Sequence, residues 1–263
     1  MRASDAQHLK ASAQAVRLLQ HYGISRPDEI CLDDIAWDLG LEISIEALKG
    51  AEAYLVRVGD VGEITLSDQL VEVGSQRFAI AHEIGHWRMH REISQLFYCT
   101  ADDLRDYRNS DPELEANTFA SEFLMPKFML DSKLLSGEPS WDTIQAIAEQ
   151  FSVITMSAAI RYADLAREPV MAVFSDGMNV KWWRENRFKM DGLWLESRQP
   201  LNDDSVAFHH ARDNISDYSL TQVPWHAWFP HIHAGEDAEL FELTGKIDDK
   251  GTMLSILWAP SYS

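Results

Sequence analysis

The composition of this 263-residue chain is that of a folded protein, because 46% of its residues are hydrophobic and 25% are charged. The length suits one large domain or two modest ones. A formal net charge of −19 would be repelled by a phosphate backbone, which argues against direct nucleic-acid binding. No apolar run reaches the roughly 18 residues that a membrane span needs, and the N-terminus lacks the apolar core of a signal peptide.

The two cysteines, Cys31 and Cys99, stand far apart in the sequence. This number and spacing indicate neither a disulfide framework nor a thiolate zinc site. We therefore expect a cytoplasmic protein, kept in a reducing compartment and without a membrane partner.

Helices and strands alternate in the first part of the chain. We expect a helix over residues 5–22, a short helix over 33–39 and a strand over 41–45. A hairpin follows, with its two strands over 52–58 and 63–67. The first helix should bury Leu9, Val16 and Leu19, and Gly40 should end the second one.

A longer helix is predicted over residues 75–91, and the polar stretch that follows it, 94–110, shows no regular pattern and predicts a loop. Asp111 and Pro112 are typical of the first residues of a helix, and Pro126 marks the end of that helix. A short helix up to Gly137 and a helix pair come next. The pair covers residues 140–151 and 155–167, and short β-like runs begin at residue 169.

A His-Glu-x-x-His motif lies inside the helix predicted over 75–91 and is formed by His82, Glu83 and His86. Histidines four residues apart lie above one another on a helix, so both imidazoles can reach one metal ion. Glu83 lies about 100° round the helix, where it can take a proton from water at that ion. The flanking residues are apolar nearly all round, which indicates a buried helix whose polar groups need partners. The motif favours metal-assisted hydrolysis, most often of a peptide bond.

A catalytic site of this kind needs a third protein ligand. The class that supplies a third histidine, through H-E-x-x-H-x-x-G-x-x-H, is excluded because Met89 and Glu92 occupy the later positions. His90 continues the histidine stripe, but it lies about 12 Å along the helix from His82, too far to share an ion. We expect His90 at the surface or beside a ligand.

The remaining candidates are carboxylates on the helix that begins at Asp111, as in the gluzincin arrangement. Glu113 shares its helical face with mostly small residues, which let a second helix approach closely, and Gly85 supplies the matching gap. Glu115 lies on what looks like the outer side. We favour Glu113 as the third ligand, with Glu115 as the alternative, and Asn117 could orient a ligand.

Three segments together resemble the ImmA/IrrE-type metallopeptidases. They are QRFAIAHEIGH at 76–86, ELEANTFA at 113–120 and FLMP at 123–126, and the resemblance covers roughly residues 50–165. It implies a zinc-dependent endopeptidase in which His82, His86 and Glu113 hold the metal and Glu83 is the general base. Mn²⁺ is an alternative to Zn²⁺, because imidazole and carboxylate ligands also suit it.

The resemblance also implies an architecture and a partner. The expected fold is α+β, with a zincin/gluzincin-like metallopeptidase domain, a helical helix-turn-helix-like segment and a β-rich, sensor-like C-terminal domain, over residues 1–137, 138–168 and 169–263. Members of this family cleave a helix-turn-helix repressor in stress responses or mobile-element induction, so the expected partner is a DNA-binding repressor as protein substrate. In and directly after the helix pair of the middle segment, Asp142, Glu149, Asp164 and Glu168 outnumber Arg161 and Arg167, which favours protein docking over DNA reading.

Three questions stay open at this level. A non-catalytic, metal-binding protein that controls a partner by binding is the alternative function, although an intact Glu83 argues for an enzyme. The strand over 52–58, with Tyr54, could form the edge of the substrate cleft, or it could be an ordinary core strand. The histidines of the C-terminal region, among them His231 and His233, could lie on its surface or line a ligand pocket.

Overall fold

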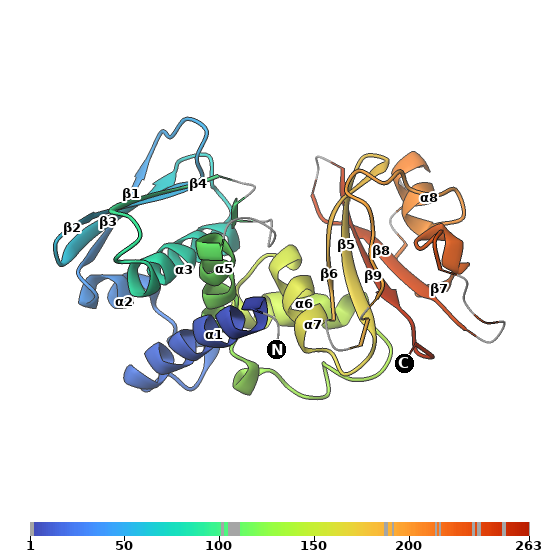
Figure 1. Ribbon diagram of the computed structural model, residues 1–263, viewed down its shortest axis with the longest axis horizontal. Helices are drawn as coiled ribbons and strands as arrows, with labels where there is room; N and C mark the ends of the chain where they lie inside the picture. Colours follow the sequence, from blue (N-terminus) through green and yellow to red (C-terminus); the bar gives the residue numbers. More distant parts are fainter. Residues whose placement is uncertain are drawn as a thin grey trace. The chain divides into compact units, whose positions relative to one another are not determined.

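The computed structural model describes residues 3–100, 103–104, 111–186, 189–190, 192–213, 215, 217–232, 235, 238–248 and 251–262. It is an α+β protein, with a four-stranded and a five-stranded sheet (Figure 1). The chain divides into two compact units, Met1–Met129 with Gln150–Ile154 and Leu130–Glu149 with Thr155–Ser263. The predicted boundaries at residues 137 and 168 stay predictions. Within the described ranges, no helix has the length and apolarity needed to cross a membrane.

The first unit contains a sheet with the strand order β1-β3-β2-β4. The strands are, in that order, Leu41–Glu46, Val61–Ser67, Ala53–Val58 and Leu96–Cys99. β1 is parallel to β3, and the other pairs are antiparallel. The predicted strand and hairpin are confirmed. The prediction of a loop over 94–110 is wrong for β4, because the backbone of β2 pairs with it; residues 101–102 and 105–110 lie outside the described residues.

β2 is an inner strand of this sheet. It pairs with β3 along its whole length, and from Ala53 to Val56 its other side pairs with β4. Its backbone groups are therefore used within the sheet, and the idea that β2 forms the open edge of a cleft is wrong. The core-strand alternative holds instead, with Ala53 and Leu55 almost fully buried.

The helices of the first unit are α1 (Ala3–His21), α2 (Leu32–Asp38), α3 (Val73–Met89) and α5 (Asp111–Leu124). Two short 3-10 turns accompany them, η1 (Pro27–Glu29) and η2 (Lys127–Met129). α5 packs against both α1 and α3, and α3 also packs on β2 and β3 (Figure 1). Gly40 ends α2 with φ 79°, and a Cβ there would lie 2.8 Å from the carbonyl oxygen of Asp60.

Two sequence expectations for these helices are wrong. Leu19 is 0% exposed as predicted and Val16 is partly buried, but Leu9 is 62% exposed, and the buried positions of α1 are Ala11, Ala15, Leu18 and Leu19. The short helix expected up to Gly137 is a single 3-10 turn, η2, followed by isolated turns.

The predicted helix pair is confirmed as α6, Trp141–Phe151, and α7, Thr155–Leu165. Ser152 follows α6 with φ 52°, and this left-handed residue ends the first helix and turns the chain. α7 packs against β5 and β6 of the second sheet.

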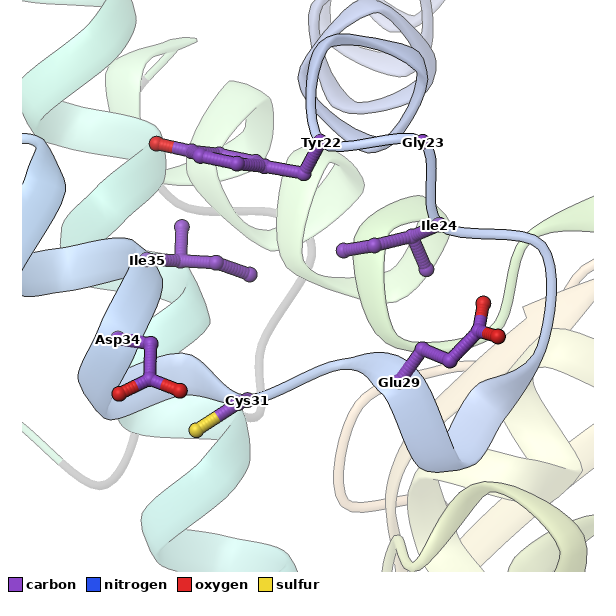
Figure 2. A pocket seen from close by; sticks show the side chains of 7 residues that line it. All are labelled: Tyr22, Gly23, Ile24, Glu29, Cys31, Asp34 and Ile35. Carbon is purple, nitrogen blue, oxygen red and sulfur yellow. The ribbon is translucent and has the colours of Figure 1, made fainter.

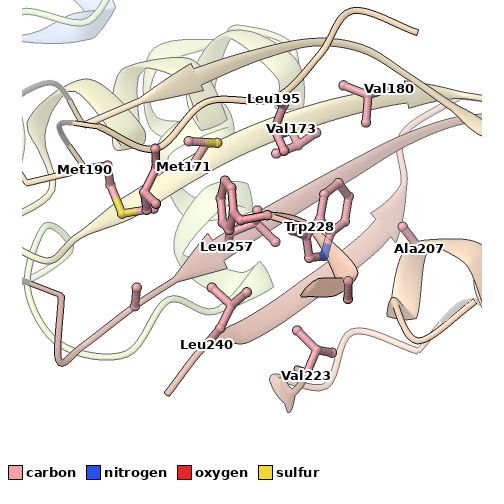
Figure 3. Close-up of a cluster of buried hydrophobic side chains, with 14 of the residues drawn as sticks. Met171, Val173, Val180, Met190, Leu195, Ala207, Val223, Trp228, Leu240 and Leu257 are labelled. Carbon is pink, nitrogen blue, oxygen red and sulfur yellow. The ribbon is translucent and has the colours of Figure 1, made fainter. Parts of the chain in front are cut away.

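The second unit is built on an antiparallel sheet with the order β6-β5-β9-β8-β7. These strands are Asn179–Glu185, Val170–Asp176, Thr252–Trp258, Phe241–Lys246 and Thr221–Gln222. The β-rich prediction is confirmed, but it omitted α8, Val206–Asp213, and the 3-10 turn η3, Trp225–Ala227. Side chains of β5 and β9, such as Met171 and Leu257, pack with Trp228 and Leu240 in a continuous core (Figure 3).

Candidate metal centre

α3 carries the His-Glu-x-x-His motif in the middle of the first unit. Every residue from Phe78 to Trp87 is buried, as the apolar flanks predicted. His82, Glu83 and His86 are each 0% exposed. Because the histidines are four residues apart, one helical turn brings their Nε2 atoms to 3.0 Å from each other.

Glu113 brings a carboxylate from α5 to the same point. Its Oε2 lies 3.1 Å from Nε2 of His82 and 3.3 Å from Nε2 of His86. Ligand atoms about 2.0–2.1 Å from a tetrahedral zinc ion lie roughly 3.3 Å from one another, so these three atoms fit a single ion. The structure thus brings together the three residues predicted as ligands.

The close approach of α3 and α5 depends on Gly85. A Cβ at this position would lie 3.2 Å from Cα of Ala116 and 3.2 Å from Cδ1 of Phe119. The gap that the sequence indicated is therefore present, and it lets the backbone of α5 carry Glu113 to the two histidines.

Each histidine has a hydrogen-bond partner on its other ring nitrogen. Nδ1 of His82 lies 2.9 Å from Oδ1 of Asn117, whose Nδ2 donates to the carbonyl oxygen of Asp103. The side-chain oxygen of Asn117 must therefore accept, so Nδ1 of His82 carries a proton and Nε2 is the nitrogen that faces Glu113.

A second chain of contacts serves His86. Its Nδ1 lies 2.8 Å from Nδ1 of His90, and Nε2 of His90 lies 3.0 Å from Oε2 of Glu115. Both residues are buried, His90 to 1% and Glu115 to 8% exposed. The expectation that Glu115 faces outward is wrong, because its carboxylate is buried against His90 at the end of α3, and α5 is packed against α1 as well as α3. His90 lies beside a candidate ligand rather than at the surface.

Glu83 is the one member of the motif with no partner of this kind. Among the described residues, neither of its carboxylate oxygens has a partner at ordinary hydrogen-bond geometry, although the Cys99 thiol is a neighbour of the group. Burial raises the pKa of Glu83 to about 7, and the neighbouring His82 and the Cys99 thiol partly oppose this rise. Burial also lowers the pKa of His86 to about 4, which leaves this imidazole neutral and able to bind a metal near pH 7. A buried carboxyl group with a pKa near neutrality is suited to general acid–base chemistry.

Cys99, the last residue of β4, also lies at this point, which sequence reasoning missed. Its Sγ is 3.4 Å from Nε2 of His82, 3.9 Å from Nε2 of His86 and 4.0 Å from Oε2 of Glu113. The expectation that no thiolate belongs to the zinc site does not match this geometry. The sequence offers no clear signal for this placement, because Leu96-Phe97-Tyr98-Cys99 shows no clear alternation of polarity.

The other described parts of the chain offer no comparable group. Within the described ranges, His82, His86, Cys99 and Glu113 form the one set of three or more His, Cys, Asp or Glu residues whose ligand atoms converge. A shallow pocket lies between the end of α1 and the start of α2 and includes Cys31 (Figure 2). Of the C-terminal histidines, His231 stacks on Trp194, and His233 lies outside the described residues.

The fold and this donor set are those of an α+β domain with a candidate metal site. Residues 38–162 match a peptidase family whose model is described as the IrrE N-terminal-like domain, so this part of the chain belongs to the ImmA/IrrE-type family. The solved structure of a Mycobacterium tuberculosis transcriptional regulator is similar, with a TM-score of 0.61 at 16% identity over 95% of this chain and 88% of that chain. This likeness shows the fold alone. No curated protein sequence matches the chain.

Proposed function

We propose that this protein is a zinc-dependent endopeptidase that cleaves a specific regulatory protein. One observation supports the proposal above all. The Nε2 atoms of His82 and His86 and a carboxylate oxygen of Glu113 converge within 3.3 Å, next to the buried carboxyl group of Glu83. A purely structural zinc site would have no need of such a group.

A bound zinc ion would lower the pKa of a coordinated water and polarise the carbonyl group of the scissile bond. Glu83 would take the proton of the attacking water and deliver it to the leaving amine. A pKa of about 7 allows Glu83 to act in both directions near neutral pH. Asn117 and His90 would hold the two imidazoles in the tautomers that leave Nε2 unprotonated.

The substrate that fits best is a helix-turn-helix repressor in the cytoplasm, cut in a stress-response or mobile-element switch. Family membership supports this choice, and the fold is shared with a protein described as a transcriptional regulator. The net charge of −19 would attract a basic, DNA-binding protein and speed their association. In this view the α6–α7 pair is a helix-turn-helix-like docking segment, and the second sheet carries a sensor-like domain.

The test is incubation of the purified chain, with and without Zn²⁺, with the helix-turn-helix protein encoded beside its gene. Zinc-dependent cleavage is expected, and it should be lost in Glu83→Gln, which keeps the three ligands. Glu92→Gln is the matched control, because Glu92 is exposed and lies shortly after the end of α3. Cleavage that persists in Glu83→Gln would contradict the assigned role of the base.

A second candidate is a metal-binding regulator that acts by binding alone. The complete burial of His82, Glu83 and His86 favours it, because a peptidase must admit its substrate to these residues. The same experiment separates the two. A repressor that is bound but left intact by every zinc-loaded variant, with equal affinity for wild type and Glu83→Gln, supports the regulator.

A further inference from the structure

The sulfur atom of Cys99 occupies the fourth corner of the metal site. The three N and O donor atoms are 3.0–3.3 Å apart, and the sulfur lies 3.4–4.0 Å from all three. With zinc–sulfur distances near 2.3 Å and zinc–nitrogen distances near 2.0–2.1 Å, a tetrahedral site places sulfur about 3.6 Å from its co-ligands. The four atoms therefore match a closed His₂-Glu-Cys zinc shell.

The position of this sulfur is set by the sheet. Cys99 is 0% exposed, it is paired with Ala53 in the β2–β4 ladder, and its carbonyl oxygen accepts from the backbone N–H of Glu52. Phe97, two residues earlier on the same face of β4, stacks on the ring of His86 with centroids 4.1 Å apart. These contacts hold one face of β4 against the ligands, so the thiol does not depend on a free side-chain rotation to reach the site.

The fourth corner is also where a hydrolytic water would have to bind. Catalytic zinc sites keep this position open, whereas structural sites fill it. In this structure both carboxylate oxygens of Glu83 are buried and the carboxyl group contacts the Cys99 thiol, so the base faces the sulfur while the sulfur stays in place. An open catalytic site would not have the Cys99 sulfur at the fourth position, and a structural zinc site would not need the carboxyl group of Glu83 beside it.

We propose that Cys99 is the fourth ligand of the bound metal ion and that it holds the peptidase in a latent form. The latency of the peptidase rests on the proposed function, whereas the assignment of Cys99 as a metal ligand is independent of it. Opening requires the sulfur to leave the metal and take up a proton, while one water molecule takes its place. Displacement of β4 from the ligands would accomplish this exchange.

The ligand assignment is tested on the full-length protein without any substrate. Zinc X-ray absorption of the wild type should show one sulfur at about 2.3 Å. The Co²⁺-loaded wild type should show an intense thiolate-to-cobalt charge-transfer band in the near ultraviolet. Both signals should be absent from Cys99→Ser and Cys99→Ala and unchanged in Cys31→Ser, the control for the exposed cysteine. A wild-type spectrum without sulfur overturns the proposal, even if the Cys99 variants fail to fold.

Zinc affinity gives a second readout. Removal of a direct ligand should weaken binding at least as much as removal of an outer partner, which costs roughly 10–100-fold. Chelator competition should therefore show at least about a tenfold loss in Cys99→Ala and none in Cys31→Ser. Equal affinities of wild type and Cys99→Ala would contradict coordination by Cys99.

Latency is tested by repressor cleavage at saturating Zn²⁺. Cys99→Ala should cleave faster than wild type, by at least about tenfold if the sulfur fills the site most of the time. Equal rates, together with a sulfur in the zinc shell, would overturn latency. Absence of cleavage in both proteins, with the sulfur signal present, would count against the proposed peptidase and leave Cys99 as a ligand of a regulatory metal site.

Discussion

Nδ1 of His90 lies 2.8 Å from Nδ1 of His86, and this contact determines which nitrogen of His86 is protonated. Glu115 can only accept when ionised, so the proton of His90 is on Nε2, 3.0 Å from Glu115, and its Nδ1 accepts from His86. Nε2 of His86 is thereby left with a lone pair at the metal position. His90, which cannot reach the ion, thus fixes the tautomer of His86, which can.

Replacement of Glu115 by alanine should weaken the control that His90 has over the tautomer of His86. His90 would stay buried without an acceptor for its Nε2–H, and the His86 tautomer would no longer be fixed. We expect zinc affinity to fall about tenfold, measured by chelator competition. Glu115→Gln keeps an acceptor oxygen and should bind zinc nearly as well as wild type, and Glu92→Ala serves as the exposed control. A wild-type affinity in Glu115→Ala would show that His90 does not orient His86.

Asn117 should matter in the same way for His82. Asn117→Ala removes the acceptor 2.9 Å from Nδ1 and should weaken zinc binding by roughly 10–100-fold. Asn117→Asp retains an acceptor oxygen but loses the donor to the carbonyl of Asp103, so it should keep most of the affinity while lowering the stability of the metal-free protein. Chelator competition and thermal unfolding separate these two effects. Equal zinc affinities of Asn117→Ala and Asn117→Asp would contradict the orienting role.

The part of the site that could be predicted from sequence is the part built by helices. His82, Glu83, His86 and Gly85 are related by one turn of one helix, and the small residues around Glu113 indicate a close helix neighbour. These relations hold whatever the rest of the chain does. The structure brings the predicted residues together for that reason.

The contribution of Cys99 could not be predicted in this way. Its place depends on the register of β4 against β2, a pairing between segments about 45 residues apart in which four residues with no clear alternation of polarity form the strand. The error about Glu115 has a related cause. The helical pattern distinguishes two faces of α5, but only the tertiary structure shows that His90, at the end of α3, reaches Glu115 on the second face.

Gly85→Ala tests the contact between α3 and α5. An added Cβ would press on the backbone of Ala116 at 3.2 Å and on the buried ring of Phe119 at 3.2 Å, so the two helices would have to move apart by a few tenths of an ångström. Overpacking of this kind destabilises by about 1–3 kcal/mol. This exceeds the gain of roughly 1 kcal/mol in helix propensity. We expect lower stability in urea and weaker zinc binding, with a larger loss in Gly85→Ser. Gly85→Ala that is as stable as wild type would show that the helices separate without penalty.

Glu242 tests the second unit independently of the metal site. Although burial raises the pKa of this carboxyl group, its oxygens accept from four donors at 2.7–2.9 Å, which are the backbone N–H groups of Val206 and Ala207, Nε1 of Trp228 and Oγ1 of Thr244. Glu242→Gln would bring an NH₂ group against one or more of these donors. We expect a loss of about 2–3 kcal/mol in the free energy of unfolding, measured by urea denaturation.

The control for this change is Glu239→Gln, on an exposed position shortly before the same strand. It should be neutral within about 0.5 kcal/mol. Both variants should retain zinc affinity. A neutral Glu242→Gln would show that water or a rearranged α8 N-terminus can satisfy the four donors.

The raised pKa of Glu83 predicts that the metal-free protein becomes less stable as the pH rises. The folded-state pKa of about 7 lies above the ordinary value of 4.5, so the folded state holds a proton that the unfolded state releases between these values. Stability is then full below pH 4.5 and declines up to about pH 7, by about 3 kcal/mol at most. Glu83→Gln has no charge to bury and should be more stable than wild type at pH 8, with little difference at pH 5. Thermal unfolding of chelator-treated proteins at both pH values measures this, with Glu92→Gln as the control. An equal effect of Glu83→Gln at pH 5 and pH 8 would mean that the Glu83 carboxyl group is not the source of the pH dependence of stability. The expected pattern would show that the residue proposed as the base is kept at the expense of folding stability.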